Sequence, residues 1–137
     1  MTSAIPPIPW AELFRIATDA RGHAYAPYSN FGVGAALLGA DGRIFPGCNV
    51  ENASYGLTIC AERNALARAV ADGCREVVAV AVVTDAERAT PPCGACRQVL
   101  VELAGPRTPV RMRTLAGVQA EHTLGELLPH AFNRDFL

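Results

Sequence analysis

An unbroken apolar segment, Val77–Val83, constrains the fold of this chain more than any other feature. Its sequence, VVAVAVV, has no polar residue to place against water, so a strand here must be covered on both faces of its sheet. Sheets of that kind have helices packed on each side. The segment therefore predicts a layered α/β domain with this strand near its centre.

Segments with helical and extended patterns alternate along the rest of the chain. Apolar residues recur at helical spacing in three segments: Trp10–Gly22, Thr58–Asp72 and Cys93–Ala104. Extended patterns occur in four segments: Phe31–Leu38, Arg43–Val50, Val110–Arg113 and Val118–His122. Gly39-Ala40-Asp41-Gly42 joins the first two of these strands and predicts a hairpin turn. Together the elements predict a three-layer α/β/α fold, in which helices cover a mixed sheet of about five strands.

Two of the predicted helices carry further detail. One apolar stripe runs along the second helix: Ala61, Ala65, Leu66, Ala69 and Val70. Gly73 can close that helix in the left-handed conformation. Thr123 and Glu126 have the spacing of a capping box, which predicts a short final helix.

The length and charge of the chain limit its class. Its 137 residues are enough for one compact core, and we expect residues 1–137 to form a single domain. Its 13 acidic and 12 basic residues nearly cancel, which argues against a nucleic-acid partner. No segment approaches the roughly 20 apolar residues of a membrane span, and the N-terminus lacks a basic stretch followed by an apolar core. We therefore expect a cytoplasmic protein without membrane contact.

Five cysteines, two of them in a C-x-x-C motif, point to the chemistry of the chain. In a chain without an export signal, this pattern favours metal or redox chemistry over a disulfide framework. Cys60 falls near the start of the second predicted helix, and Cys93 and Cys96 fall near the start of the third. Residues three apart share a helix face, so the latter pair can reach one ion. Helix N-termini favour thiolates, and zinc suits a sulfur-rich site best.

Other interpretations of these cysteines are open at this point. The C-x-x-C motif alone also fits two buried cysteines or a thioredoxin-like redox pair, although a redox pair leaves Cys60 and Glu62 unexplained. A structural zinc site closes with four protein ligands, whereas a catalytic site keeps a position for water. Cys74 lies about 20 Å from Cys60 along a regular helix, which excludes it as a fourth ligand. Cys48 lies in the second strand and is disfavoured as a ligand, so we expect the fourth position to hold water.

Glu62 and Arg63 lie two and three residues after Cys60 and indicate what such an ion could do. Taken alone, Glu62 is an ordinary acid of a first helical turn, and Arg63 is an ordinary surface residue. Beside three thiols, Glu62 can move a proton between a zinc-bound water, whose pKa falls to about 7, and a substrate nitrogen. Arg63 can offset the negative charge of the site by hydrogen-bonding a thiolate.

Longer motifs extend this pattern over nearly the whole chain. The C-A-E and P-C-G-A-C signatures, with FGVGAALL, GCNVENASYGLTICAERNAL, PCGACRQVL and LLPHAF, resemble the small cytidine deaminases of pyrimidine salvage from about Trp10 to Phe132. The resemblance implies a cytidine-deaminase-like fold and one zinc ion per subunit. It also implies hydrolytic deamination of cytidine and 2′-deoxycytidine to uridine and 2′-deoxyuridine, with release of ammonia.

The resemblance also assigns roles to individual residues. It implies that Cys60, Cys93 and Cys96 bind zinc and that Glu62 is the catalytic proton shuttle. Members of this class are homotetramers with shared active sites. The remaining positions match substrate-binding residues: Phe31 against the base, Asn49 and Glu51 on the ribose hydroxyl, Ala53 and Tyr55 at cross-subunit contacts, Ala61 beside the ligand Cys60, and Phe132 stacking on the base across an interface.

Three rival functions are considered beside this one. A relative acting on a nucleoside antibiotic such as blasticidin S is disfavoured by the Asn49-x-Glu51 pair, which suits a plain ribosyl substrate. A nucleic-acid editing deaminase lacks a phosphate-tracking surface here, because the net charge is −1. A structural zinc module would need Cys48 as its fourth ligand. We interpret Arg107, Arg111 and Arg113 as a solvated strand edge or as inter-subunit ion-pair residues rather than as a phosphate site.

Overall fold

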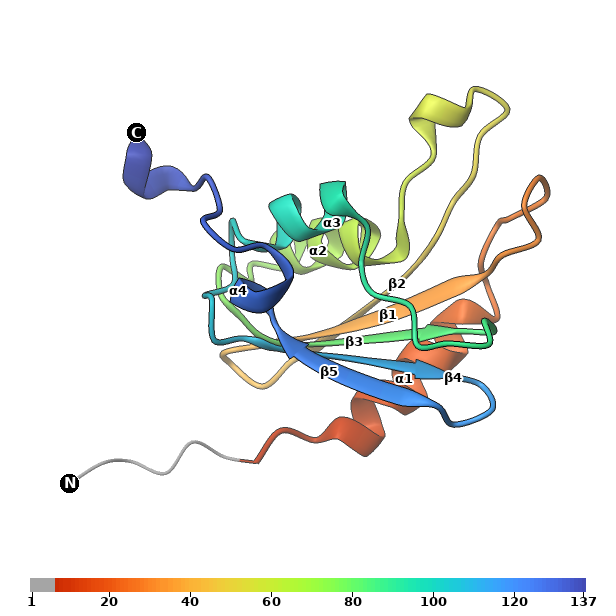
Figure 1. Ribbon diagram of the computed structural model, residues 1–137, viewed down its shortest axis with the longest axis horizontal. Helices are drawn as coiled ribbons and strands as arrows, with labels where there is room; N and C mark the ends of the chain where they lie inside the picture. The colour runs from red at the N-terminus through yellow and green to blue at the C-terminus, as the bar shows by residue number, and fades with distance from the viewer. Residues whose placement is uncertain (1–6) are drawn as a thin grey trace.

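Helices and strands alternate along the computed structural model, which describes residues 7–137 (Figure 1). Residues 1–6 of the predicted domain lie outside the described residues. In chain order the elements are α1 (Trp10–Arg21), β1 (Val33–Gly39), β2 (Ile44–Cys48), the 3₁₀ turn η1 (Tyr55–Leu57), α2 (Ala61–Ala71), β3 (Val77–Thr84), α3 (Gly94–Leu100), β4 (Pro109–Thr114), β5 (Gln119–Thr123), α4 (Leu124–Leu127) and the 3₁₀ turn η2 (Arg134–Phe136). Within residues 7–137, no helix has the length and apolar character needed to cross a membrane.

The apolar strand β3 lies at the centre of a five-stranded sheet with the order β2-β1-β3-β4-β5. It pairs in parallel with β4, whereas the other three strand pairs are antiparallel. The connection from β3 to β4 passes through α3, as a parallel pair requires a crossover. The prediction of a mixed sheet with VVAVAVV at its centre is confirmed.

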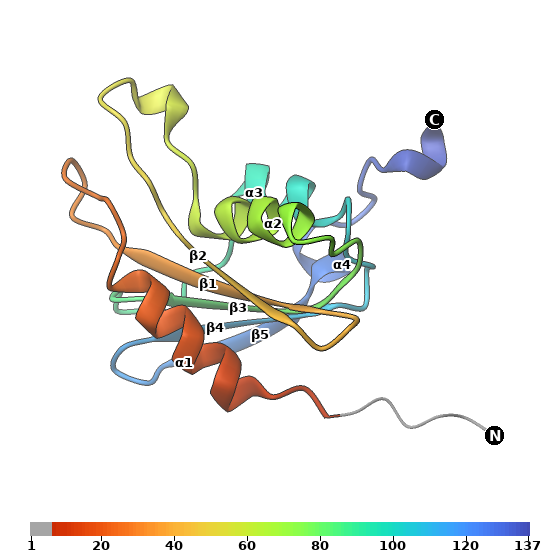
Figure 2. The same cartoon turned by 180° about the vertical axis from the view of Figure 1, so that it is seen from behind.

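Helices cover both faces of the sheet, with α1 on one face and α2 and α3 on the other (Figures 1 and 2). Alternate residues of β3 point to opposite faces. Ala79, Ala81 and Val83 pack in the core cluster under α1, whereas Val80 and Val82 pack in the cluster under α2 and α3. The prediction of a three-layer α/β/α fold is therefore confirmed.

A glycine lets α2 lie directly on β2, and this contact places the first turn of α2. A Cβ atom at Gly47 would lie 2.4 Å from both the Ala61 carbonyl oxygen and the Ala65 nitrogen, closer than side chains can approach. Gly34 serves α1 in the same way, since a Cβ atom there would lie 1.9 Å from the Ala17 carbonyl oxygen. Only glycine permits such backbone contact.

Two helices are shorter than predicted, because long-range backbone pairing ends them. α2 begins at Ala61 since the preceding Ile59 exchanges two backbone hydrogen bonds with Val50, at 2.9 and 3.0 Å. α3 ends at Leu100 since the residues that follow turn back to pair with Val77 of β3. The start of α2 and the end of α3 therefore depend on partners that are distant in the sequence.

Other details of the helices match the sequence, with one exception. Gly73 has a φ of 93° at the end of α2, and Thr123 and Glu126 form the capping box of α4. Val70, which was predicted to lie in the apolar stripe of α2, is 39% exposed. About two and a half turns separate Val70 from Ala61, which places them on opposite sides of the helix.

Arg111 and Arg113 lie on the α1 side of β4, where they cover two aromatic rings. The guanidinium carbon of Arg111 is 4.3 Å from the Trp10 ring centroid, and that of Arg113 is 4.1 Å from the Phe14 ring centroid. Arg111 also forms an ion pair with Glu121 of β5. These two arginines are therefore half-buried by cation–π packing within the chain rather than free at a solvated edge.

Candidate active site

Three thiols meet at the N-termini of α2 and α3. Cys60 is the N-cap residue of α2, Cys93 is the N-cap residue of α3, and Cys96 lies in the first turn of α3. The sulfur atoms of this cysteine trio lie within 4.8 Å of one another, and those of Cys60 and Cys93 are 3.7 Å apart. Both helix dipoles favour negative charge at this place. The fold thus brings together the three cysteines predicted to bind metal.

The spacing of these sulfur atoms fits a zinc ion. Tetrahedral coordination at a Zn–S distance of about 2.3 Å separates two sulfur ligands by about 3.8 Å. The distance between the Cys60 and Cys93 sulfur atoms matches that separation. Within residues 7–137, no further Cys, His, Asp or Glu belongs to the group. A set of three protein ligands leaves one position for water or substrate, which is the arrangement of catalytic zinc sites.

Cys60 and Cys96 shift each other's pKa in opposite directions. A hydrogen bond from the Cys96 thiol is the main cause that lowers the pKa of Cys60 to about 5, and Arg63 and Cys93 act in the same direction. The same hydrogen bond is the main cause that raises the pKa of Cys96, and burial adds to it. Cys60 is therefore a thiolate at neutral pH, whereas Cys96 must release its proton when a metal binds.

Arg63 lies against the Cys60 thiolate. Its Nη2 donates to the Cys60 sulfur at 3.6 Å and to the Thr58 carbonyl oxygen at 3.3 Å. The hydrogen bond to Cys60 is the main cause that raises the pKa of Arg63. The Arg63 Nε is buried and has no hydrogen-bond partner among residues 7–137. The guanidinium is thus held close to the charge that it is predicted to offset.

Glu62 lies on the buried face of α2, two residues after the N-cap residue Cys60. Its side chain is 4% exposed, on the side of the helix that carries Ala61, Ala65 and Ala69. Burial is the main cause that raises the pKa of Glu62 from 4.5 to about 7, and the Cys60 thiolate adds to the rise. An ordinary first-turn acid would be solvated and ionised. A carboxyl group that titrates near neutral pH can both accept and donate a proton.

The other two thiols lie apart from the trio. Cys74, past the far end of α2, is buried, and its Sγ donates to the Glu76 carbonyl oxygen at 3.3 Å. Cys48 ends β2 and lines a separate hollow of about 370 Å³ together with Ile16 and His23. Neither thiol belongs to the trio. The described residues therefore offer no fourth thiol that would close a structural zinc site.

Asn49 follows β2 directly and holds the segment before β1 in place. Its Oδ1 accepts from the Val33 N–H at 2.8 Å, and its Nδ2 donates to the Phe31 carbonyl oxygen at 2.8 Å. The side chain is buried, whereas the Phe31 ring is partly exposed. Asn49 thus connects the end of β2 to the residue that is predicted to contact the base.

Glu51 points to the same segment as Asn49, as alternate residues of an extended chain do. Its carboxylate accepts from the N–H groups of Tyr28 at 2.9 Å and Ser29 at 3.2 Å, and also from the Ser29 hydroxyl. The Ser29 hydroxyl is the main cause that lowers the pKa of Glu51. Ser29 Oγ also accepts from the Phe31 N–H at 3.0 Å. Ser29 has no sequence signal of this role other than its place two residues before Phe31.

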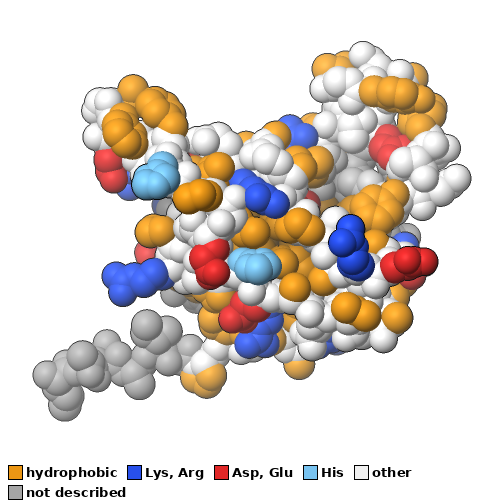
Figure 3. Space-filling model, in the orientation of Figure 1, with side chains coloured by type: hydrophobic (Ala, Val, Ile, Leu, Met, Phe, Trp, Pro, Cys, Tyr) orange, Lys and Arg blue, Asp and Glu red, His pale blue; other side chains and the backbone are white. Residues whose placement is uncertain are grey.

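Two segments that carry further predicted site residues project from the body of the domain. Tyr55, in the loop before α2, is 73% exposed, and Phe132, near the C-terminus, is 59% exposed. Both views place these segments at opposite ends of the α2 and α3 layer (Figures 1 and 2). Hydrophobic side chains gather on each of them (Figure 3). Ala53 lies exposed in the same loop as Tyr55, whereas Ala61 is fully buried in the first turn of α2.

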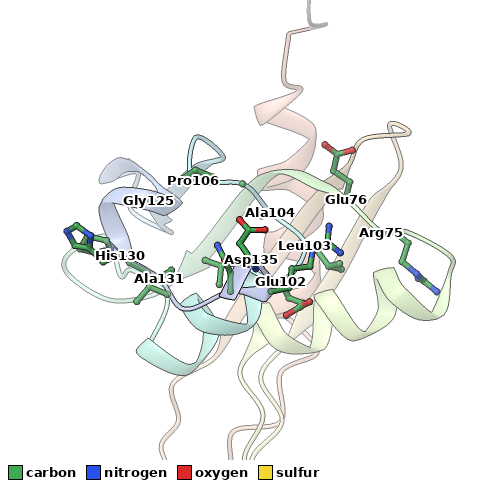
Figure 4. A pocket seen from close by; sticks show the side chains of 16 residues that line it. Arg75, Glu76, Glu102, Leu103, Ala104, Pro106, Gly125, His130, Ala131 and Asp135 are labelled. Atoms are coloured by element: carbon green, nitrogen blue, oxygen red, sulfur yellow. Dashed lines mark hydrogen bonds between the residues drawn. The ribbon is translucent and has the colours of Figure 1, made fainter. Parts of the chain in front are cut away.

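A hollow of about 700 Å³ lies under the C-terminal segment, away from the trio (Figure 4). Its walls come from the residues just before β3, the segment that follows α3, and α4 with the segment after it, and they include both acidic and basic side chains. None of the predicted site residues lines it. The volume of this hollow therefore says nothing about the chemistry of the trio.

The sequence and the fold match those of known deaminases. Residues 10–112 match the family described as the cytidine and deoxycytidylate deaminase zinc-binding region. A cytidine deaminase of Halalkalibacterium halodurans is 55% identical over 123 residues, which cover 90% of this chain and 93% of that protein. One of Mycobacterium tuberculosis is 44% identical and covers 97% of this chain and 96% of that protein. The crystal structure of a Burkholderia pseudomallei cytidine deaminase superposes with a TM-score of 0.87 at 50% identity, covering 91% of this chain and 100% of that one.

The fold and the site together define a zinc-binding α/β protein with one buried carboxyl group beside three thiol ligands. The range that matches the family contains the whole trio and Glu62. The chain belongs to the cytidine and deoxycytidylate deaminase zinc-binding family.

Proposed function

We propose that this chain catalyses the hydrolytic deamination of cytidine and 2′-deoxycytidine, in which water and the nucleoside yield ammonia and the uracil nucleoside. The observation that carries the proposal is Glu62: a buried carboxyl group with its pKa raised to about 7, two residues after Cys60, one thiol of a trio whose spacing fits a metal ion. Its relatives of 55% and 44% identity are named cytidine deaminase, which supports the substrate. The reaction places the chain in pyrimidine salvage.

Glu62 moves the protons of this reaction. Its carboxyl group protonates N3 of the base, takes a proton from the attacking water and delivers a proton to the leaving amine. A carboxyl group with a pKa near 7 suits all three steps, because both of its forms are populated at neutral pH. Burial excludes bulk water from these transfers.

Cys60, Cys93 and Cys96 hold the zinc ion. Bound zinc supplies a Lewis acid that lowers the pKa of a coordinated water to about 7. Three thiolates would leave excess negative charge at the site, and Arg63 offsets part of it through its hydrogen bond to Cys60.

The substrate is bound by residues that surround the end of β2. Asn49 and Glu51 bind the ribose hydroxyl, and Phe31 packs against the base. The hydrogen bonds that both polar side chains make to the 28–33 segment support this arrangement, because they hold the binding residues together before substrate arrives. Ala61 contributes the wall next to Cys60.

The complete enzyme is a homotetramer in which neighbouring subunits share active sites. Tyr55 and Phe132 are exposed on projecting segments of one chain, and a second copy would cover them. Ala53 lies in the same projecting loop as Tyr55. In the tetramer, Phe132 of one subunit stacks on the base bound by another. Residues 1–137 form one domain, and the cytoplasmic location predicted from the sequence stays a prediction.

Incubation of the zinc-loaded protein with cytidine, in parallel with and without a chelator, tests the proposal. We expect equal amounts of uridine and ammonia, and loss of both products after zinc is removed. Deoxycytidine and blasticidin S, assayed side by side with cytidine, test the substrate class. Turnover of blasticidin S alone, or no product from any of the three, would contradict the proposed function.

A further inference from the structure

Two residues that follow Cys96 connect the start of α3 to the C-terminal part of the chain. Arg97 donates from Nε to the Pro92 carbonyl oxygen at 2.8 Å and from Nη1 to the Leu127 carbonyl oxygen at 2.8 Å. The first bond closes the loop just before Cys93. The second reaches the last residue of α4, 30 positions away. One guanidinium therefore joins a zinc-ligand loop to the base of the C-terminal segment.

Gln98 makes the next connection along the same segment. Its Nε2 donates to the Phe132 carbonyl oxygen at 2.8 Å, across 34 positions of sequence. Within residues 7–137, the other side-chain and backbone hydrogen bonds of residues 129–137 stay inside that segment. Among the described residues, the bond from the Gln98 amide is thus the one hydrogen bond that connects residues 129–137 to the rest of the domain.

Apart from the Gln98 hydrogen bond, few contacts hold the C-terminal segment, residues 129–137, in place among the described residues. The Phe132 and Phe136 rings stack as one unit, with 5.7 Å between their centroids and 14° between their planes. That unit is exposed, and little apolar packing holds it in place within one chain. The segment also forms one wall of the hollow of about 700 Å³, so it does not rest on a filled core (Figure 4).

From these contacts we infer that Arg97 and Gln98 are positioning residues, which set the C-terminal segment bearing Phe132 relative to the cysteine trio. Gln98 orients the Phe132 backbone, and Arg97 holds both the Cys93 loop and the end of α4. This inference rests on the proposed function, because Phe132 matters for catalysis only if it stacks on the substrate base.

The Gln98→Leu variant tests the tie to Phe132, with Gln119→Leu as a matched control on the exposed β5 strand. We expect Gln98→Leu to raise the KM for cytidine about fivefold and to leave kcat within about twofold, because a neutral hydrogen bond is lost away from the reacting atoms. Phe132→Ala should raise KM further, and the double variant should match Phe132→Ala alone. An unchanged KM in Gln98→Leu, or additive effects in the double variant, would overturn the inference.

Amide hydrogen exchange gives a readout that does not depend on activity. In Gln98→Leu, we expect residues 129–137 to exchange at least about fivefold faster, with exchange in α3 unchanged. Equal exchange in the variant and the wild type would refute the tie even if the protein deaminates cytidine. If the wild type forms no uridine, the proposed function fails, and the exchange experiment still decides whether the tie exists.

Arg97→Met tests the link to the zinc-ligand loop, with Arg75→Met as its control. Arg75 also donates to two backbone carbonyl oxygens, at 3.0 and 2.9 Å, but lies away from the trio. We expect Arg97→Met to release zinc to a chelator about tenfold faster, and Arg97→Lys to fall between it and the wild type. Equal zinc release from the Arg97→Met and Arg75→Met proteins would refute the link. If Arg97→Met does not fold, Arg97→Lys decides by the same measurement.

Discussion

The two halves of the proposed active site are built in different ways. The cysteine trio, Glu62 and Arg63 lie at the start of two helices, and the contacts that place them come from the same chain. Tyr55 and Phe132 instead project from the domain and are largely exposed. The buried half is assembled by contacts within one chain, whereas the described residues leave the two projecting rings largely uncovered.

The largest effect is expected when a ligand of the trio is lost. Cys93→Ser should reduce the zinc content from one per chain to a small fraction and lower the rate of deamination by roughly 10³-fold or more. The variant keeps only two thiolate ligands, Cys60 and Cys96. Cys48→Ser is the matched control and should keep both, because Cys48 lines a different hollow. Metal analysis beside a cytidine assay checks both variants. Loss of zinc from Cys48→Ser would instead support a structural four-thiol site.

A smaller effect is expected where α2 touches β2. Gly47→Ala should lower the free energy of unfolding by about 3 kcal/mol, because the added Cβ would lie 2.4 Å from backbone atoms of α2. The displaced helix would also weaken zinc binding through Cys60. Gly105→Ala meets no atom within 4 Å and should change stability by less than about 0.5 kcal/mol. Equal denaturant midpoints for the two variants would show that α2 does not depend on this contact.

The raised pKa of Glu62 predicts a pH dependence in the metal-free protein. The folded pKa of about 7 lies above the ordinary value of 4.5, so the folded state binds the proton more tightly than the unfolded state. The stability that Glu62 contributes is therefore present at low pH and is lost as the pH rises through about 7. Relative to the wild type, the free energy of unfolding of Glu62→Gln should therefore increase by about 2 kcal/mol when the pH rises from about 5 to about 8. Denaturant unfolding at both pH values measures this gain, and parallel pH profiles would contradict it.

The smallest effect is expected at Ser29, which connects two residues that are proposed to bind substrate. Ser29→Ala should raise the KM for cytidine about fivefold with little change in kcat, because Glu51 and Phe31 each lose a partner. The pKa of Glu51 should rise toward its ordinary value, since the Ser29 hydroxyl is the main cause of its depression. Ser29→Thr keeps the hydroxyl and should keep a KM close to that of the wild type. Steady-state kinetics of both variants would show whether the hydroxyl or only the side-chain volume matters.

Local patterns were sufficient to predict most of the fold. The VVAVAVV run placed β3 at the sheet centre, and Gly73 and the Thr123–Glu126 pair marked helix ends correctly. The wrong helix ends, before Ala61 and after Leu100, follow from backbone pairing with distant strands. Such pairing leaves no trace in the spacing of nearby residues.

In the proposed site, too, local patterns predict some residues and miss those that depend on distant partners. The i, i+3 spacing of Cys93 and Cys96 follows from helix geometry, and the same geometry could have shown that Glu62, rather than Val70, lies on the buried face of α2. Arg97 and Gln98 act through carbonyl oxygens 30 and 34 positions away, which have no side-chain signature. Tyr55 and Phe132 lie exposed outside the helices and strands of the core, so neither helical nor strand periodicity predicts a role for them.

The role of Glu62 next to a zinc-loaded trio is tested most directly by measuring zinc content and uridine formation together in Glu62→Gln. We predict one zinc per chain, as in the wild type, with kcat for cytidine lowered at least about 10³-fold, because the amide keeps the volume but cannot transfer the protons. A variant that keeps its zinc and forms uridine at nearly the wild-type rate would contradict the account.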